Sequence, residues 1–540
     1  MAAIPNTPAP LPAPVAGRPP VAPPPARGYS PPPLEGSARI LGTIALSVAT
    51  FMNVLDTSIA NVSIPAISGD VGVSTSQGTW VITSFAVANA ISVPLTGWLT
   101  QRIGAVRLFT ASILLFVVAS LACGLAPNLG LLILFRVIQG AVAGPMIPLS
   151  QTLLLASYPK ERSGTALGLW AMTTLVAPVV GPVLGGYITD NISWPWIFYI
   201  NVPVGILTAW ASWTIYRTRE TPIKISPVDG VGLGLLIIWV GSLQVMLDKG
   251  KELDWFHSSM IVTLGLVAAV GFVLFLVWEL VDNKHPIVDL SLFKRRNFSS
   301  GVLGLSIGYG AFFGNVVIVP LWLQTQMGYT ATEAGLMMAP VGVLAILITP
   351  VLGRNLPRLD PRVVASVAFA IFAFVSFMRA GFNTQVDPAH VIIPTIIQGA
   401  AMGSFFLPLT ALALAGLPPE RIAAASGLSN FVRITAGAIG ASVVTTLWEN
   451  RSSMHHAYLT ESITAYSLPT TETMNILTAG GMDKMQATGS MERMVDFQAH
   501  MLGADDVFWL TGVIFVFLMF VIWVAKPDRS GKVVDAGGAH

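Results

Sequence analysis

The stretch Ile138–Gly144 reads IQGAVAG, and the same pattern returns as IQGAAMG at Ile397–Gly403. The segment PKERSGTALGL that follows the first copy returns as PPERIAAASGL in the same register, about 259 positions later. Such a repeat indicates two copies of one structural unit, and the polarity of the loops is the same around both copies. This pattern is typical of membrane transporters with two similarly oriented halves around an axis along the membrane normal.

Apolar residues dominate the composition, and this argues against a soluble domain. The chain has 540 residues, of which 53% are hydrophobic and 10% are charged, with a mean hydropathy of +0.70. A soluble domain carries about 25% charged residues. Runs of about twenty apolar residues recur along the chain, and each is long enough to cross a hydrocarbon layer of about 30 Å. The net charge of +2 forms no basic stripe, so nucleic-acid binding is not expected.

The apolar runs predict an all-α polytopic membrane protein with fourteen spans. The distance between the repeat copies exceeds one six-helix unit by about two helices, which indicates a six-two-six layout. Two helices are then inserted between two pseudo-repeated six-helix halves. The predicted spans begin near Ile40, Thr79, Val106, Leu129, Gly164, Trp196, Val231, Ser259, Gly301, Ala334, Val363, Val391, Ala423 and Val507.

Positive charge gathers on alternate loops, such as those that carry Arg102, Arg217, Arg295 and Arg358. The positive-inside rule places these loops, and with them both termini, in the cytoplasm. The expected segments are a disordered Pro-rich cytoplasmic tail (1–37), the first half (38–217), the two inserted helices and a linker (218–297), the second half (298–526) with a long periplasmic segment (449–506), and a cytoplasmic tail (527–540).

The long periplasmic segment contains the adjacent residues His455 and His456. Adjacent histidines point in different directions on a helix, so a solvated surface is favoured over a metal site.

Several motifs resemble a known family. They are LDTSIANVSIPAI in the first span, TWVITSFAVANAISVPLTGWL in the second, FRVIQGAVAGPMIPLSQ in the fourth, APVVGPVLGGYI in the fifth and WIFYINVPVG in the sixth. Together with LPPERIAAASGLSNF and the tripeptide MHH, they resemble the fourteen-helix drug:proton antiporters of the major facilitator superfamily (MFS). Within these, the chain is similar to the EmrB-type inner-membrane subunits of tripartite efflux pumps.

This resemblance implies a multi-pass protein of the bacterial inner membrane that exports hydrophobic drugs and toxic compounds in exchange for protons. It also implies two partners, a periplasmic membrane-fusion adaptor of the EmrA type and an outer-membrane channel of the TolC type. No cofactor is expected, because the sequence has no nucleotide-binding motif and an ion gradient remains as the energy source. The alternative is a transporter of the same fold with a narrow physiological substrate, such as a siderophore or metabolite exporter. No zinc-ligand spacing, nucleophile elbow or phosphate-binding loop supports an enzyme.

Asp56 and Arg136 are ionisable residues deep inside predicted spans. With a rise of about 1.5 Å per residue they reach a similar depth, so a pair across the bundle is possible. An unpaired charge at that depth costs at least about 2.5–3.5 kcal/mol, so both side chains should face the interior. We expect Asp56 to bind the coupling proton and Arg136 to tune that binding, with a static strut as the alternative. The repeat equivalent of Arg136 is Thr395, so this charge belongs to one half only.

Two motifs are expected to carry the conformational change. In GPVLGG the glycines remove side-chain bulk and the prolines delete helix hydrogen bonds, which predicts a tight, kinkable joint between the halves. Ordinary close packing is the alternative. GWLTQRIGAVR resembles a superfamily signature that couples neighbouring helices, but Gln101 stands at the usual acidic position, so a hydrogen-bonded latch is expected. The motif residues are Pro178, Gly181, Pro182, Gly185 and Gly186, and Gly97, Arg102, Gly104 and Arg107.

Polar and aromatic side chains on the inner faces of the spans are expected to line the substrate cavity. Arg433 lies near the middle of a span without an acidic partner in adjacent sequence. It is expected either to face the cavity and attract anionic or weakly acidic compounds, or to balance a carboxylate from elsewhere. The other expected lining residues are Asn89, Gln139, Gln151, Trp170, Met172, Tyr309, Asn315, Gln324, Gln398 and Phe405.

Overall fold

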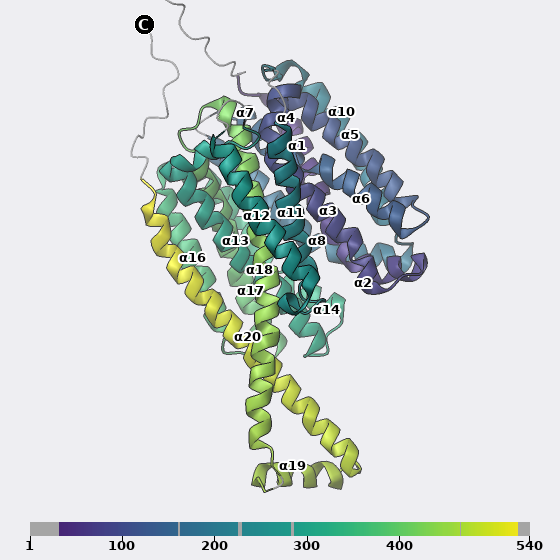
Figure 1. Ribbon diagram of the computed structural model, residues 1–540. Helices are drawn as coiled ribbons and strands as arrows, with labels where there is room; N and C mark the ends of the chain where they lie inside the picture. Colours follow the sequence, from purple (N-terminus) through teal and green to yellow (C-terminus); the bar gives the residue numbers. More distant parts are fainter. Residues whose placement is uncertain (1–31, 160–161, 225–228, 282–285, 465, 527–540) are drawn as a thin grey trace, which may run out of the picture.

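The computed structural model describes residues 32–159, 162–224, 229–281, 286–464 and 466–526, and every regular element within these ranges is helical. Figure 1 shows one bundle of long helices with a helical projection at one end. The predicted all-α fold is confirmed. Most of the expected proline-rich tail and the whole of the expected C-terminal tail lie outside the described residues.

The first half is built from six spans, three of them made of more than one helix. Its elements are α1 (Gly36–Val71), α3 (Trp80–Ser92) continued by α4 (Thr96–Ile103), α5 (Ala105–Gly124), α6 (Leu129–Ala143) continued by α7 (Met146–Ser157), α8 (Ser163–Asn191), and α9 (Trp196–Tyr199) followed by α10 (Asn201–Tyr216).

The second half repeats this order after the two inserted helices α11 (Gly230–Lys249) and α12 (Ser259–Val281). Its elements are α13 (Arg296–Thr325), α14 (Ala331–Met338) continued by α15 (Val341–Asn355), α16 (Pro361–Arg379), α17 (Pro388–Leu414), α18 (Pro419–Ser462) and α20 (Lys484–Val521).

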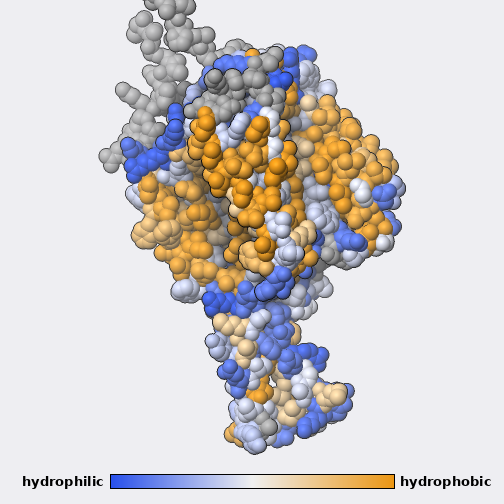
Figure 2. Space-filling model, viewed as in Figure 1, coloured by the Kyte–Doolittle hydropathy of each residue, from blue (hydrophilic) through white to orange (hydrophobic). Residues whose placement is uncertain are grey.

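The number of spans agrees with the fourteen that the sequence predicts. Twelve helices in the described ranges are long and apolar enough to cross a bilayer, and the bent helix α8 adds a thirteenth. The remaining predicted span, the sixth, begins near Trp196 and corresponds to α9 and the 16-residue α10. Figure 2 shows a broad apolar belt across the visible face of the bundle and polar surface beyond it, as expected for a protein whose solvent is lipid.

Several helix starts are fixed by caps that the sequence supplies. Asn128 accepts a hydrogen bond from the Leu131 N–H at the start of α6. Asp360 and Asp387 cap α16 and α17 in the same way, and each is followed by a proline in the first helical turn. Proline is favoured there because its missing N–H would have no partner inside the helix. These caps set where the chain enters each span.

The bundle has two distinct ends. We call the end that carries Arg102, Arg217 and Arg295 the basic end, and the opposite end the projection end. At the basic end the two halves touch closely: a methyl group added at Gly97 would lie 2.7 Å from Cβ of Ala424. A methyl group at Gly164 would lie 2.3 Å from the carbonyl oxygen of Gly353. The basic end is therefore closed.

The inserted helices lie against the seam between the halves. Lys249 of α11 donates a 2.6 Å hydrogen bond to Thr79, beside α3 of the first half. Ser442 of α18, in the second half, donates a 2.9 Å hydrogen bond to the Leu247 carbonyl. One inserted helix thus contacts both halves near the projection end.

The projection consists of the ends of α18 and α20 and of α19 (Leu468–Ala479), which crosses between them (Figure 1). His455 pairs with Asp506 at 3.0 Å and His456 with Glu492 at 3.1 Å, which ties the two long helices together. Each histidine has its own carboxylate partner, and no group of three or more possible metal ligands occurs in the part of the chain that the structure describes. The long segment 449–506 is therefore an ordered helical hairpin.

Candidate functional site

A buried ion pair lies inside the first half. Nη1 of Arg136, on α6, donates a 2.6 Å hydrogen bond to Oδ2 of Asp56, on α1. Both residues are closed to solvent, with 0% and 2% of their surface exposed. The sequence allowed this pair, and the structure brings the two side chains together. A charged pair so deep in an apolar bundle is stable only when its remaining donors and acceptors are also bonded.

Two amides complete the bonding of the Asp56 carboxylate. Nε2 of Gln139 donates to Oδ1 at 3.1 Å, and Nδ2 of Asn201 donates to the same oxygen at 2.9 Å. Gln139 also accepts a 2.7 Å bond from Arg136, and Asn201 also donates to Ser120. The carboxylate therefore joins α1 to α6 and α10. Gln139 was expected in the substrate cavity and belongs instead to this cluster.

The guanidinium of Arg136 is held by more than its acid. Its Nε donates a 3.0 Å bond to the Val81 carbonyl, and the group lies 4.3 Å from the ring centre of Phe85 and 5.5 Å from that of Phe198. Nη2 has no partner among the described residues. A cation between two aromatic faces is stabilised electrostatically. Arg136 is therefore fixed in place, and a change in protonation of Asp56 would act on a rigid partner.

A small cavity lies between the two halves near the centre of the bundle. Its volume is about 10 Å³, enough for about one water molecule. Gln151 and Trp170 line it from the first half, and Asn430 and Arg433 line it from the second. Nδ2 of Asn430 donates a 3.4 Å hydrogen bond to Gln151 across the seam. The halves are therefore in contact at this level.

Arg433 lines this cavity, which is the first of the two placements expected from the sequence. Its guanidinium lies 4.6 Å from the ring centre of Tyr309 and 5.7 Å from that of Phe406, and it donates a 2.9 Å hydrogen bond to Asn430. No carboxylate pairs with it among the described residues. Tyr309 thus contacts the lining residue Arg433 and is not itself among the residues that line the cavity.

Other expected lining residues lie elsewhere. Asn315, Gln398 and Phe405 are buried within the second half, away from the residues that line the central cavity. Asn89 is buried in α3 and is also absent from that lining. Gln324 lies near the projection end of α13 and bonds to the Pro320 carbonyl, and the side chain of Met172 is outside the described residues. Helical periodicity does not separate the interior of one half from the surface between the halves, and contact of these residues with a substrate stays a prediction.

The glycine-proline run of α8 packs against α1 within the first half, and not between the halves as expected. A methyl group at Gly181 would lie 2.4 Å from Oγ of Ser58, and one at Gly185 would lie 3.1 Å from the Ile59 carbonyl oxygen. Gly186 is less crowded, with its nearest neighbour at 3.9 Å. The expected close approach exists, but its partner is the helix that carries Asp56.

A bend accompanies this contact. The segments Gly164–Pro178 and Val183–Asn191 of α8 meet at 42°, around the position of Pro182, whose side chain lies outside the described residues. Ser58 donates a 3.2 Å hydrogen bond to the Pro178 carbonyl. A serine two residues from Asp56 thus contacts the bent part of α8.

The motif after the second span is contacted by a carboxylate from the segment after α10, which sequence reasoning missed. Glu220 accepts hydrogen bonds from the backbone N–H groups of Val106 and Arg107 at 3.0 and 2.9 Å, which caps α5. Gly104 has a φ of +95°, and a methyl group there would lie 2.4 Å from Oε1 of Glu220. The positive φ favours glycine at this position, and a side chain there would also displace the Glu220 carboxylate. Arg102 stacks on Trp98 at 5.5 Å.

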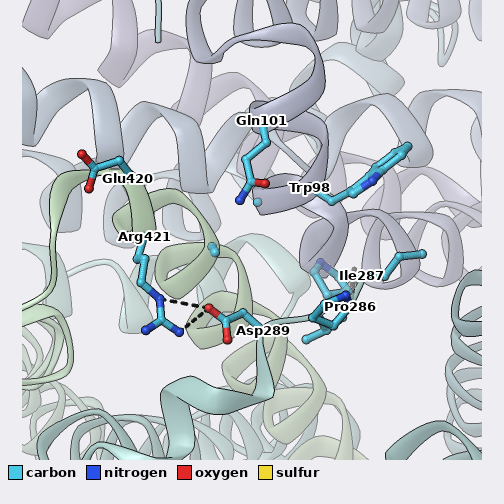
Figure 3. Close-up of a pocket in the computed structure, with 11 residues that line it drawn as sticks. Trp98, Gln101, Pro286, Ile287, Asp289, Glu420 and Arg421 are labelled. Carbon is cyan, nitrogen blue, oxygen red and sulfur yellow. Dashed lines mark hydrogen bonds and ion pairs between the residues drawn. The ribbon is translucent and has the colours of Figure 1, made fainter. Parts of the chain in front are cut away.

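A second carboxylate at the basic end joins the linker to α18. A pocket of about 180 Å³ lies beside this contact. Figure 3 shows its lining, with Gln101 and Trp98 from the first half, Asp289 from the linker and Arg421 from α18. Nε of Arg421 donates to Asp289 at 3.0 Å, and its Nη2 bonds to the same carboxylate. The acid that is lacking at position 101 is thus present at two other positions. Both lie in connecting segments, where sequence gives no sign of their partners.

Comparison with known proteins supports this architecture. The family model described as Major Facilitator Superfamily matches residues 46–441. The chain is 51% identical over 510 residues to the Multidrug export protein EmrB of Escherichia coli (strain K12), covering 94% of this chain and 99% of that protein. It is 48% identical, with the same coverage, to the Fatty acid resistance protein FarB of Neisseria gonorrhoeae. The solved human organic anion transporter MFSD10 matches 90% of this chain and 100% of its own with a TM-score of 0.57, and at 11% identity it supports the fold alone.

Proposed function

Because this chain belongs to the major facilitator superfamily and to its EmrB-type multidrug efflux transporters, we propose that it exports hydrophobic drugs in exchange for protons that bind at Asp56. The observation that carries the proton-binding step is the buried Asp56–Arg136 pair. Members of this superfamily are transporters, and we propose neither an enzymatic activity nor a cofactor for this chain.

Protonation of Asp56 would loosen one side of the bundle. As a carboxylate, Asp56 accepts from Arg136, Gln139 and Asn201. A carboxylic acid has lost the charge that favours these donors, and its O–H is itself a donor that needs an acceptor. The contacts of α1 with α6 and α10 would therefore weaken when the proton arrives and re-form when it leaves.

This local change has a route to the contact between the halves. Ser58, close to Asp56 on α1, packs against Gly181 of α8 and bonds to the Pro178 carbonyl. The other end of α8 carries Gly164, which lies against Gly353 of the second half at the basic end. A shift of α1 would thus act on α8, and through it on the closure of the basic end.

The two halves must move apart at the central cavity before a drug can bind. Sites for drug-sized molecules have volumes of about 300–1,000 Å³, whereas the central cavity has about 10 Å³. Separation would break the Gln151–Asn430 bond and expose Trp170, Phe406 and Arg433. Aromatic walls with one cation suit hydrophobic compounds, including organic acids.

The direction of transport follows from the loops. The positive-inside rule assigns the basic end to the cytoplasm and the projection to the periplasm of an inner-membrane protein, with both termini cytoplasmic. The projection would then contact a membrane-fusion adaptor of the EmrA type that leads to an outer-membrane channel of the TolC type. Its exposed apolar residues, Tyr466, Leu468 and Ile476, support a role in protein contact, since they lie outside the apolar belt.

The test is drug movement in proteoliposomes under an imposed pH gradient. The wild-type protein should move a fluorescent hydrophobic drug against its concentration gradient, and Asp56→Asn should abolish this movement while drug binding remains. Asp70→Asn is the matched control, because Asp70 is an exposed acid on the same helix that only accepts from Trp194. Uphill transport without a pH gradient, or full activity of Asp56→Asn, would refute the proposal. Transport of one compound alone from a panel would favour an exporter with a narrow substrate.

A further inference from the structure

The second half repeats the surroundings of Asp56 without the acid. With the offset of the internal repeat, the positions that correspond to Asp56, Arg136 and Gln139 are Asn315, Thr395 and Gln398. Asn315, Thr395 and Gln398 are 3%, 0% and 2% exposed. The second half therefore has a buried polar cluster at the place of the proton-binding cluster in the first half.

This second cluster contains a cation of its own. Arg379, at the end of α16, corresponds by the same offset to Ser120, which lies beside the Asp56 cluster in the first half. Arg379 is 1% exposed, and Nη2 donates a 3.1 Å hydrogen bond to Thr395. Its Nε has no partner, and no ion pair to Arg379 occurs in the described ranges of the chain. The guanidinium is thus buried without a counter-charge.

The two amides of the cluster are also unbonded. Within the described residues, neither the Asn315 nor the Gln398 side chain makes a hydrogen bond, and Oδ1 and Oε1 are closed to solvent. In the first half the corresponding groups, Asp56 and Gln139, bond to each other at 3.1 Å. Buried polar groups are almost always bonded to protein, water or a ligand.

Aromatic contacts lie on both sides of these groups along α13, α16 and α17, and we call the region between the two sets of contacts the chamber. On the side of the basic end, the ring centres of Phe312 and Phe372 are 5.6 Å apart and those of Phe372 and Phe405 are 5.7 Å apart. On the side of the projection end, Trp322 stacks on Phe382 at 5.9 Å. The indole N–H of Trp322 has no partner among the described residues.

The polar residues lie between these two aromatic layers. Asn315 lies between Phe312 and Trp322 along α13. Arg379 ends α16, after Phe372, and Phe382 follows it in the connection to α17. Gln398 is two helical turns from Phe405 along α17, toward Thr395. The chamber therefore has apolar layers on two sides and a cation with unbonded amides between them.

We propose that this chamber binds a small monovalent anion of the size of chloride. The anion would occupy the place that the Asp56 carboxylate has in the first half, with Arg379 as its counter-charge. A side-chain amide can turn its NH2 group toward an anion by rotating 180°, so Asn315 and Gln398 would act as further donors. An unpaired charge in the bilayer region is costly, and a bound anion offsets that cost. None of these polar residues is more than 3% exposed, which leaves no opening for a drug-sized acid, so the anion comes from solution.

A surface cavity lies next to these residues at the projection end. Met378 and Pro394, the chain neighbours of Arg379 and Thr395, line a surface cavity of about 350 Å³ there. The proposal concerns binding within the second half and does not depend on proton-coupled export.

Bromide gives the direct test, because its anomalous scattering identifies it in crystals of the full-length protein. Crystals grown with bromide in place of chloride should have an anomalous peak in contact with the Arg379 guanidinium. The absence of a peak in that chamber would overturn the proposal, whatever the result of the transport assay.

Thermal unfolding of the purified protein tests the same site in solution. A ligand that binds the folded state raises Tm with its concentration, so replacing gluconate by chloride at constant ionic strength should raise the Tm of the wild type. Arg379→Gln should lose this shift. Asn315→Asp should supply the missing carboxylate, so its Tm in gluconate should match that of the wild type in chloride, with no further response.

Arg433→Gln is the matched control, because it removes another buried arginine that has amide and aromatic partners. It should keep the chloride response. An equal response in wild type and Arg379→Gln, or none in the wild type, would contradict the proposal. If Arg379→Gln does not fold, Asn315→Asp and the bromide crystals still decide.

Discussion

Arg136 donates a 2.6 Å hydrogen bond to Asp56, and neither side chain has more than 1% of its surface exposed. Breaking a buried ion pair by removing one partner costs about 3–5 kcal/mol, because it leaves an uncompensated buried charge. Arg136→Gln should therefore lower the unfolding free energy by about that amount. Asp56→Asn combined with Arg136→Gln should regain most of it, because no charge remains. Unfolding in detergent of the wild type, both single variants and the double variant measures this coupling.

The double variant also separates a static strut from a proton site. A folded double variant that still moves drugs under a pH gradient would contradict proton binding at Asp56. A folded double variant without such transport would support it.

Arg433 should make the transporter favour weakly acidic substrates over neutral ones. It lines the central cavity with Tyr309 and Phe406 against its guanidinium and without a carboxylate partner among the described residues. Arg433→Gln should reduce transport of weakly acidic drugs by about tenfold relative to neutral ones, since one charge contact of about 1.5 kcal/mol or more is lost. The readout is the ratio of transport rates for an acid and a neutral compound of similar size. Arg433→Lys, which keeps the charge, should preserve most of that ratio, and an unchanged ratio in Arg433→Gln would exclude this role.

The closed basic end depends on glycines that face each other across the halves. A methyl group at Gly164 would lie 2.3 Å from the Gly353 carbonyl oxygen. Overpacking of this kind costs about 1–3 kcal/mol, and here the cost falls only on the arrangement with the basic end closed. Gly164→Ala should slow export by about tenfold or more and increase labelling of a cysteine introduced as Gln151→Cys from the basic side. Gly234→Ala on α11, where nothing lies within 4 Å, is the control and should leave both readouts unchanged.

Much of the fold could be predicted because lipid makes apolar length a direct signal. The fourteen spans and the two halves follow from apolar runs and from the IQGAVAG repeat. The helical continuation of α18 as far as Ser462 could not be predicted, since it leaves the apolar region and hydropathy no longer reports it. Contacts between residues far apart in the sequence, such as the pair between His455 and Asp506, hold that continuation in place.

The charged residues of the candidate site could be predicted from the sequence, but the amide side chains that bond to them could not. Asp56 and Arg136 stand out because a charge inside a span is expensive. Asn201 and Gln139 are neutral, and many such residues occur in spans, so only the folded arrangement identifies the two that bond to Asp56. Glu220 was missed for a related reason, because it lies in a connecting segment and its partners are backbone groups of α5.

The projection should be needed for a partner and not for transport itself. On α19, Leu468 and Ile476 are 78% and 67% exposed, so replacing both with serine removes little packing and should leave the fold intact. If an adaptor binds there, cells that carry Leu468→Ser with Ile476→Ser should lose drug resistance, and crosslinking to the adaptor should fall. Transport by the purified variant in proteoliposomes should equal that of the wild type, because the central cavity and Asp56 are untouched. Asn475→Ser, an exposed polar change on the same helix, should have neither effect. Full resistance and full crosslinking in the double variant would mean that the tip of the projection makes no essential contact.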